Sequence, residues 1–320
     1  MYFRIAARDP FRPTRAPALE RLLARADARS RVTGWRQPAY QAVAGGATEP
    51  PAIGAAQLHA SGDAQRDGWV ALATPVHLVA GMSHVQLPAD GMLEIDTAEA
   101  DRLAADFNRS FGGGGVRMAR GRGSTLLCVF DSPISVQTAS PEDALGEDVW
   151  THQPRGPDAA ALRRLSTEIE MWLFGHAVNA ARAARGAPAI SALWLWGGGA
   201  ADAAMPAIEG WTAGNDALFS AFAPRAQYPR AAGSGSARPG VVVLSTWPGT
   251  PAWSEAERSW LEPAVDDLKA GRLRRIEISA AETSFTVSAR GLARFWRKSR
   301  PWWEFFGIDA PPAQDGRLDA

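Results

Sequence analysis

Three stretches of the chain repeat their apolar residues at the three- and four-residue spacing of a helix. In "DTAEADRLAADFNRSF", Leu103 and Phe107 fall on one face, and Asp96 stands before them as a candidate cap residue. "APALERLLARADARS" carries the same pattern near the N-terminus. The longest stretch, "DAAALRRLSTEIEMWLFGHAVNAARAARG", predicts one continuous helix that ends at Gly186, because glycine suits the position that follows a helix.

Other stretches are continuous apolar runs of strand length, which are typical of buried strands. These runs are "GWVALATPVHLVA", "STLLCVF", "AISALWLW" and "VVVLSTW". The last two alternate with helical stretches, which predicts parallel strands joined by helical crossovers. The sequence therefore predicts an α/β fold with a mostly parallel sheet and flanking helices. The first half, with a hairpin and one crossover helix, predicts a smaller α+β portion.

One segment has the composition of a domain boundary. "QPRGPDAA", residues 153–160, contains two prolines and a glycine between two patterned regions. It divides the chain into an N-terminal α+β portion, residues 1–152, and a C-terminal α/β portion, residues 153–307. Residues 308–320 are expected to form a disordered tail.

The charges of the chain balance, with 34 Lys and Arg against 34 Asp and Glu. A chain without net charge exerts no long-range attraction on a polyanion, so nucleic acid is a disfavoured partner. No apolar run reaches the length of a membrane span, and the start "MYFRIAARDP" lacks a signal-peptide core. We therefore expect a cytoplasmic protein without a membrane partner. Cys128 is the only cysteine, which excludes a disulfide within the chain.

Three glycines, Gly197, Gly198 and Gly199, directly follow the apolar run "LWLW". Glycines at the end of a strand can expose backbone N–H groups to a phosphate, because no side chain blocks its approach. They can also let the chain turn beneath two bulky indole rings. The segment has neither the spacing of a dinucleotide fingerprint nor the lysine of a P-loop, so both interpretations stay open.

The segment "FGHAVN" carries the strongest group of polar residues. His176 and Asn179 lie three positions apart and would share one helix face, and Glu168 and Arg182 would extend that face along the helix. An imidazole, an amide and a guanidinium beside a carboxylate could hold an anionic ligand. The alternative is a buried histidine that is hydrogen-bonded across a helix–sheet interface, with Glu168 paired to an arginine.

Metal and nucleophile motifs are not evident from the spacing of residues. The five histidines are scattered without a metal-binding spacing, and no GxSxG segment is present. Basic residues gather late in the chain and alternate with aromatic ones: Arg272, Arg274, Arg275, Arg290, Arg294, Phe295, Trp296, Arg297, Lys298, Arg300, Trp302 and Trp303. Such a mixture can bind nucleic acid by charge and stacking, or it can be the solvated face of a helix whose aromatic residues close the core.

The run "RRLSTEIEMWLFGHAVNAARAARGAPAISALWLWGGGA" resembles the signature of the bacterial RpfE-type regulatory proteins. The matching positions are Glu168, Met171, His176, Val178, Asn179, Arg182, Gly186, Trp194, Trp196, Gly197 and Gly199. "ATPVHL", "AEADRLAADFNRSF" and "GRLRRIEI…FTVSARGLARFWRK" also resemble that family, so the resemblance covers nearly the whole chain. It implies a regulatory role.

The same core is similar to a segment of the archaeal-type cofactor-independent phosphoglycerate mutases, which belong to the alkaline phosphatase superfamily. This resemblance implies a partly alkaline-phosphatase-like fold and an anion pocket that includes the "FGHAVN" residues and the glycines. Those enzymes use a serine nucleophile and two divalent metals held by aspartates and histidines. Here "VVVLS" is followed by "TWPGTPAW", and Trp247, Pro248 and Gly249 offer no metal ligand. No cofactor is therefore expected.

Three hypotheses about function follow. The first is a non-catalytic regulatory protein, similar to a phosphoglycerate mutase, that binds a phosphorylated small molecule in a degenerate pocket formed by His176, Asn179, Arg182, Glu168, Gly197, Gly198 and Gly199. The second is an active metal-dependent mutase. The third is an interaction module that uses the basic, aromatic C-terminus, and the many tryptophans indicate a protein partner or a homodimer.

Overall fold

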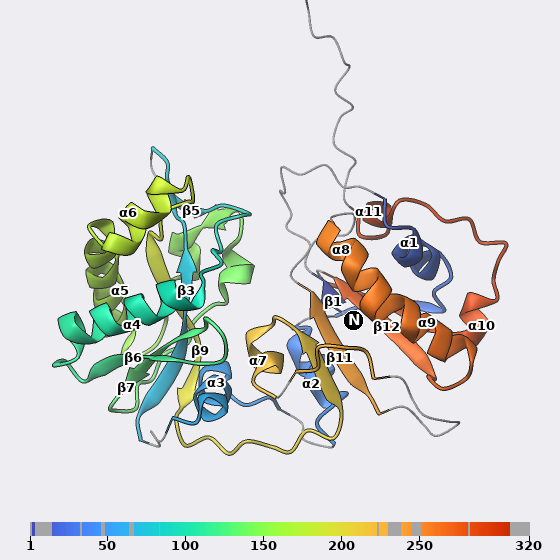
Figure 1. Cartoon of the computed structure of the whole chain (residues 1–320), viewed down its shortest axis with the longest axis horizontal. Coiled ribbons are helices and arrows are strands. Elements are labelled where there is room, and N and C mark those ends of the chain that lie inside the picture. Colours follow the sequence, from blue (N-terminus) through green and yellow to red (C-terminus); the bar gives the residue numbers. More distant parts are fainter. Residues whose placement is uncertain are drawn as a thin grey trace, which may run out of the picture.

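The chain forms two lobes, one at each side of Figure 1. The computed structural model describes residues 2–3, 15–32, 34–45, 49–63, 67–82, 84–222, 224–229, 238–244, 251–280 and 282–307. One lobe is built on a six-stranded sheet, and the other on a four-stranded sheet with a small three-stranded sheet beside it. The protein therefore has a mixed α/β fold, as the sequence predicts.

The six-stranded sheet combines parallel and antiparallel strands. Its strands, in spatial order, are β10 (Trp211–Gly214), β11 (Gly240–Leu244), β1 (Tyr2–Phe3), β12 (Arg275–Ala280), β13 (Thr283–Ser288) and β2 (Ala28–Arg31). The first four are parallel to one another, whereas β13 is antiparallel to both β12 and β2. Among the described strands, parallel pairing is thus found only between these four.

The other two sheets are antiparallel throughout their described strands. The four-stranded sheet has the order β6 (Val116–Arg120), β7 (Leu126–Phe130), β3 (Trp69–Val76) and β9 (Ala192–Ala200). The three-stranded sheet consists of β4 (Val79–Ala80), β5 (Val85–Leu87) and β8 (Glu147–Asp148). The prediction of a mostly parallel sheet was therefore wrong. The run "AISALWLW" is part of β9, which pairs antiparallel to β3. The prediction failed because an antiparallel strand that is covered on both faces has the same continuous apolar pattern as a buried parallel strand.

Helices cover the faces of the two larger sheets (Figure 1). In the order of the chain they are α1 (Pro17–Ala24), α2 (Arg36–Gln41), α3 (Ile53–Ser61), α4 (Thr97–Phe111), α5 (Ala159–Phe174), α6 (Ala177–Ala184), α7 (Ala217–Ser220), α8 (Pro251–Ala256), α9 (Glu262–Lys269), α10 (Ala289–Leu292) and α11 (Trp302–Phe305). Short 3-10 turns η1 (Pro141–Ala144) and η2 (Val149–His152) flank β8, and a π-helical turn η3 (Glu257–Leu261) joins α8 to α9.

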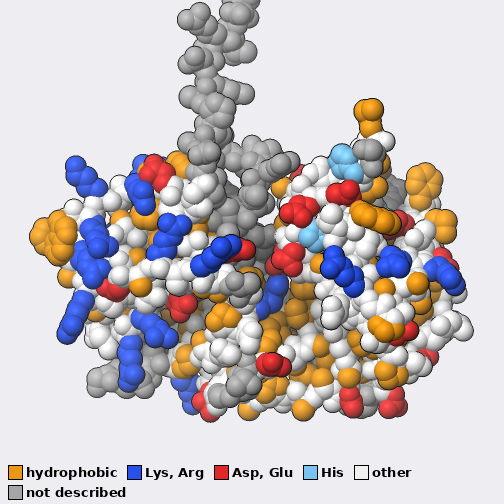
Figure 2. All heavy atoms as spheres, turned by 180° about the vertical axis from the view of Figure 1, so that it is seen from behind, with side chains coloured by type: hydrophobic (Ala, Val, Ile, Leu, Met, Phe, Trp, Pro, Cys, Tyr) orange, Lys and Arg blue, Asp and Glu red, His pale blue; other side chains and the backbone are white. Residues whose placement is uncertain are grey.

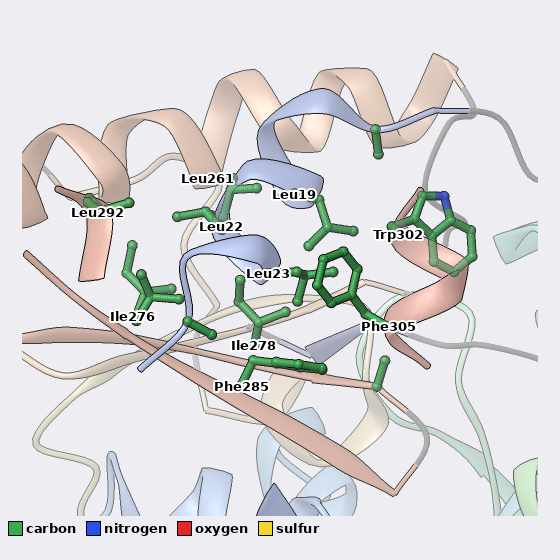
Figure 3. Close-up of a cluster of buried hydrophobic side chains, with 14 of the residues drawn as sticks. Leu19, Leu22, Leu23, Leu261, Ile276, Ile278, Phe285, Leu292, Trp302 and Phe305 are labelled. Carbon is green, nitrogen blue, oxygen red and sulfur yellow. The ribbon is translucent and has the colours of Figure 1, made fainter. Parts of the chain in front are cut away.

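The core of the six-stranded lobe lies between α1, the α8–α9 segment, α11 and the sheet. Leu19, Leu22 and Leu23 of α1 point into it, and they are almost completely buried. Figure 3 shows Phe305 of α11 beside Leu23 and above Phe285 of the sheet. The apolar spacing that predicted the first helix is therefore the face that closes this core.

Both faces of the four-stranded sheet are covered, so its strands read as continuous apolar runs. Alternate residues of β9 face opposite sides: Leu193 and Leu195 pack with α4 and α5, whereas Trp196 packs with α3. Asp96 caps α4 as predicted, because its carboxylate accepts the Glu99 N–H at 2.8 Å while the Glu99 side chain accepts the Asp96 N–H.

The strands do not divide between the sheets at residue 153, where the sequence suggested a domain boundary. The six-stranded sheet takes β1 and β2 from the N-terminal portion, and the four-stranded sheet takes β9 from the C-terminal portion. The tail predicted at 308–320 lies outside the described residues. Among the described helices, none combines the length and the apolar character that crossing a bilayer requires.

Candidate functional site

The long helix predicted over residues 158–186 is interrupted at the position of the "FGHAVN" motif. α5 ends at Phe174, and His176 is the N-cap residue of α6, with an extended ψ of 138°. Its Nδ1 atom accepts the backbone N–H of Val178 at 3.2 Å. The sequence reasoning missed this break, although Gly175 and a polar residue together are a signal for a helix end and a new cap. The predicted end of the segment at Gly186 is confirmed by its φ of 70°.

The ring of His176 is enclosed between α4 and α5. It is 8% exposed, and its Nε2 atom lies 3.1 Å from Oδ2 of Asp106. The indole of Trp172 packs against it with ring centroids 4.5 Å apart. Burial lowers the pKa of His176 and outweighs the opposing effect of Asp106, while Arg102 and Arg109 lower it further. Because Nδ1 accepts a hydrogen bond, the neutral imidazole carries its proton on Nε2, facing Asp106.

Asn179 uses its whole amide group inside the protein. Its Nδ2 donates to the carbonyl oxygens of Leu173 and Ile190, both at 2.9 Å. Its Oδ1 accepts the N–H of Ile190 at 2.8 Å. The side chain thereby ties the end of α5 to the residue that leads into β9. These bonds account for both amide hydrogens and leave only a second lone pair on the oxygen.

Arg182 is also committed to internal partners. It is 4% exposed, its Nε donates to the carbonyl oxygen of Pro188 at 2.7 Å, and Nη1 donates to both carboxylate oxygens of Glu99. Arg185 pairs with the same carboxylate. Although burial opposes ionisation of Glu99, bonds from Arg185, the Asp96 N–H and Arg182 leave its pKa below the usual value. We call His176, Asn179 and Arg182 the clasp, since they bind α6 to α4, α5 and the start of β9.

The structure does not bring the predicted pocket residues together. Glu168 lies exposed on α5, and no ion pair joins it to Arg182 among the described residues. The glycines occupy the far end of β9: Ile190, which the clasp contacts, precedes Gly198 by eight residues of extended chain, about 25 Å. The sequence also placed the glycines beyond the carboxyl end of a parallel strand. That was wrong, because they lie within an antiparallel strand.

Close packing explains the three glycines. A Cβ atom on Gly198 would lie 2.0 Å from the indole of Trp69, and one on Gly199 would lie 2.4 Å from Cβ of Ala52. Gly197 has a φ of 63°, which disfavours any residue with a side chain. The glycines therefore let β9 pass against β3 and the start of α3.

A second polar cluster, which sequence reasoning missed, joins the two lobes. Arg36, the first residue of α2, donates from Nε to Asp216 at 2.9 Å and from Nη2 to Glu142 at 2.8 Å. Its guanidinium also lies over the indole rings of Trp35 and Trp196, at 4.8 and 5.3 Å from their centroids. Burial opposes its charge, but the two carboxylates more than compensate and raise the pKa of Arg36 above its usual value. We call Arg36, Glu142 and Asp216 the interlobe junction.

The interlobe junction lies where ligands of parallel sheets are commonly bound. Asn215 and Asp216 directly follow β10, at the carboxyl end of the parallel strands. Asp216 is buried and also caps α7 by accepting the N–H groups of Leu218 and Phe219. Residues 245–250, which follow β11, lie outside the described residues. No signal in the sequence links positions 36, 142 and 216, which only the tertiary fold brings together.

The described part of the chain contains neither a metal-binding cluster nor a reactive cysteine. There, no three His, Cys, Asp or Glu residues converge in an arrangement that could hold a metal ion. Cys128 is completely buried within β7, and burial raises the pKa of its thiol to about 12. It is therefore a core residue.

Comparison with known proteins gives a weak relationship to one enzyme family. No family model matches the chain. Over 118 residues, 36% of the chain, it is 33% identical to the 2,3-bisphosphoglycerate-independent phosphoglycerate mutase 2 of Methanothermobacter thermautotrophicus, and this match covers 29% of that relative's length.

Two solved structures are similar over most of the chain, at low TM-scores. The cofactor-independent phosphoglycerate mutase from Thermoplasma acidophilum has a TM-score of 0.36 at 14% identity, covering 90% of this chain and 89% of that one. The PH0037 protein from Pyrococcus horikoshii has a TM-score of 0.38 at 12% identity, covering 90% and 87%.

Replacing Gly198 with Ala tests the packing explanation for the glycines. We expect a loss of about 1–3 kcal/mol in the free energy of unfolding, because the new Cβ atom collides with the buried ring of Trp69. Urea unfolding measures it. Gly113→Ala is the matched control, since no atom lies within 4 Å of a Cβ there. Equal stability of the two variants would show that packing does not require glycine at 198.

The buried neutral state of His176 predicts a pH-dependent stability. Because its pKa is lower in the folded than in the unfolded protein, the unfolded state binds more protons as the pH falls through about 6.5. His176 therefore contributes a loss of stability on acidification from pH 7.5 to 5.5. His176→Asn keeps an acceptor at the N-cap and removes the titration, so its stability should fall less over this range.

His176→Ala separates the cap from the titration. It should lower the free energy of unfolding by about 1 kcal/mol at pH 7.5, because the Val178 N–H loses its acceptor. Urea unfolding of the three proteins at several pH values checks both effects. Identical pH dependence of the wild type and His176→Asn would contradict the assignment of a buried neutral imidazole.

Proposed function

We propose that this chain is a non-catalytic relative of the cofactor-independent phosphoglycerate mutases that binds a phosphorylated metabolite and acts as a regulatory protein. The observation that carries the proposal is the 33% identity over 118 residues with a phosphoglycerate mutase. The regulatory part rests on the resemblance to the RpfE-type proteins. The segment after β11, "TWPGTPAW", contains no Asp, Glu or His, so it supplies none of the side chains that would hold two cations there.

We assign the ligand to the interlobe junction rather than to the clasp. The polar groups of Asn179 and Arg182 are taken up by bonds within the protein, and breaking them would also detach α6. At the interlobe junction, Arg36 offers a planar guanidinium at the carboxyl end of parallel strands, which suits bidentate recognition of a phosphate.

A phosphate would enter the interlobe junction by replacing Glu142. The side chain of Glu142 is 25% exposed, whereas that of Asp216 is 2% exposed and holds the start of α7. Exchange of Glu142 for a phosphate therefore leaves Asp216 bound to Arg36. Because Glu142 belongs to η1 and Arg36 to α2, the exchange releases a contact between the lobes. Ligand binding would thus be coupled to the arrangement of the lobes.

Binding of 3-phosphoglycerate to the full chain tests this assignment by isothermal titration calorimetry. Glu142→Gln should tighten binding about tenfold, because the competing carboxylate is removed, and Arg36→Met should weaken it by about tenfold or more. Glycerate, which lacks the phosphate, should not bind. Glu255→Gln, an exposed carboxylate paired with Arg258, is the matched control. Absence of binding, or binding that Arg36→Met leaves unchanged, would overturn the assignment.

A turnover measurement separates binding from catalysis. Incubated with 3-phosphoglycerate and Mn²⁺, the wild-type chain should form no 2-phosphoglycerate by phosphorus NMR, since "TWPGTPAW" supplies no ligand for the cations. Metal-dependent conversion at a rate above that of the protein-free solution would instead support the second hypothesis, an active mutase.

A further inference from the structure

The charges of this neutral chain are unevenly distributed between its parts. The described residues 15–32, 251–280 and 282–307, which build most of the six-stranded lobe, carry 15 Lys and Arg against ten Asp and Glu. Because the whole chain has 34 of each, the remainder has a surplus of acidic residues. Figure 2 shows Lys and Arg side chains gathered over this lobe, at the left of that view. The balanced total therefore conceals a basic surface.

A cleft of about 500 Å³ opens in this basic surface, between the edge strand β2 and the segment that leads to α11. Four cationic side chains line it: Arg29, Arg297, Lys298 and Arg300. Among the described residues, no carboxylate lies within ion-pair distance of the first three, and Arg300 has only a long contact of 3.9 Å with Glu304. The one carboxylate that lines the cleft, Asp27, is paired with Arg294. A neighbouring cleft of about 470 Å³ has two carboxylates, Glu262 and Asp266, among its basic residues.

Two exposed aromatic residues, Phe295 and Trp296, directly precede Arg297 of this cleft in the sequence. Residues 294–297 form a tight turn, in which the Arg297 N–H donates to the carbonyl oxygen of Arg294 at 3.1 Å. Phe295 is 80% exposed and Trp296 66% exposed, and their ring centroids lie 5.4 Å apart at nearly a right angle. Large apolar side chains so exposed are expected at contact sites.

The turn that carries the two rings is fixed to the body of the lobe. The guanidinium groups of Arg294 and Arg297 both donate to the carbonyl oxygen of Ala26, at 3.1 and 2.9 Å. Arg294 also pairs with Asp27, whose carboxylate accepts the Ser288 N–H. The rings therefore project from an anchored turn, so that little conformational entropy would be lost when they meet a partner.

We propose that this surface, formed by Arg29, Phe295, Trp296, Arg297, Lys298 and Arg300, binds single-stranded nucleic acid. Arg29, Arg297 and Lys298, which have no acidic partner among the described residues, match the phosphates of the strand, and the exposed rings that precede Arg297 match its unpaired bases. Single-stranded nucleic acid supplies both features in one repeating polymer. An acidic peptide would supply the charge but no regular series of planar rings. The proposal does not depend on the metabolite site at the interlobe junction.

Variants that test the surface must leave the anchored turn intact. Arg294 and Arg297 are unsuitable because their guanidinium groups hold the turn on Ala26. The stacking variant is Phe295→Ala with Trp296→Ala, and the charge variant is Arg29→Glu with Lys298→Glu. The controls lie on α5 in the other lobe: Phe174→Ala, at a residue 93% exposed, and Arg164→Glu, at another exposed residue.

The measurement is fluorescence anisotropy of a labelled 20-nucleotide oligothymidylate with the full chain, from 50 to 200 mM salt. The wild type should bind, and its affinity should fall as salt rises. The stacking variant should bind about 10- to 100-fold more weakly, because base–ring stacking contributes strongly to such binding. The charge variant should reduce the slope of log K against log salt by about 1.4, from two lost phosphate contacts. The controls should bind like the wild type.

Three results would overturn the proposal. The first is no binding of the oligonucleotide by the wild type at 50 mM salt. The second is a result that shows no recognition of unpaired bases: either unchanged affinity of the stacking variant, or equal affinity of the wild type for the oligonucleotide and for a duplex of the same length. The third is stronger binding of a polyglutamate peptide than of the oligonucleotide with the same dependence on Phe295 and Trp296, which would assign the surface to an acidic protein partner instead.

Discussion

The antiparallel pairing of β3 with β9 separates the polar motif at His176 from the glycines at 197–199. β9 runs along the edge of the four-stranded sheet, with helices packed on both of its faces. Asn179 fixes the chain just before the N-terminal end of β9 by accepting the Ile190 N–H, and the C-terminal end of β9 packs against Trp69. A strand of this length holds its two ends far apart. The polar motif and the glycines, close in sequence, therefore belong to different parts of the lobe.

The clasp shows why a polar motif on a helix is ambiguous in a sequence. A helix that ends and restarts leaves backbone N–H and carbonyl groups without partners, and a buried chain must satisfy them. His176 and Asn179 do this at the end of α5 and the start of α6, and Arg182 satisfies the carbonyl of Pro188. The same residue types would bind an anion. Side-chain chemistry alone cannot separate these two roles, because satisfying backbone groups and binding an anion both use hydrogen-bonding side chains at the same spacing.

Long-range electrostatics gives this fold its two most distinctive surfaces. At the interlobe junction, Arg36 satisfies two carboxylates that lie 106 and 180 residues away in the chain. A guanidinium removed from water needs such partners, since an unpaired buried charge is costly. On the six-stranded lobe, Arg29, Arg297 and Lys298 lie exposed, and no described carboxylate is within ion-pair distance of them. The first arrangement neutralises a buried cation between the lobes, and the second presents cationic side chains to solvent.

The sequence by itself determined most of the local structure: the apolar face of α1, the cap residue Asp96 of α4, the helix end at Gly186, and the buried strands. These features depend on neighbours within one turn or one strand, so residue type and spacing in the local sequence reveal them. Strand direction, the helix break at His176 and the interaction partners of Arg36 were decided by the tertiary structure. They depend on contacts between segments that are distant in the sequence. An apolar run or a single arginine does not by itself specify which distant segment it contacts.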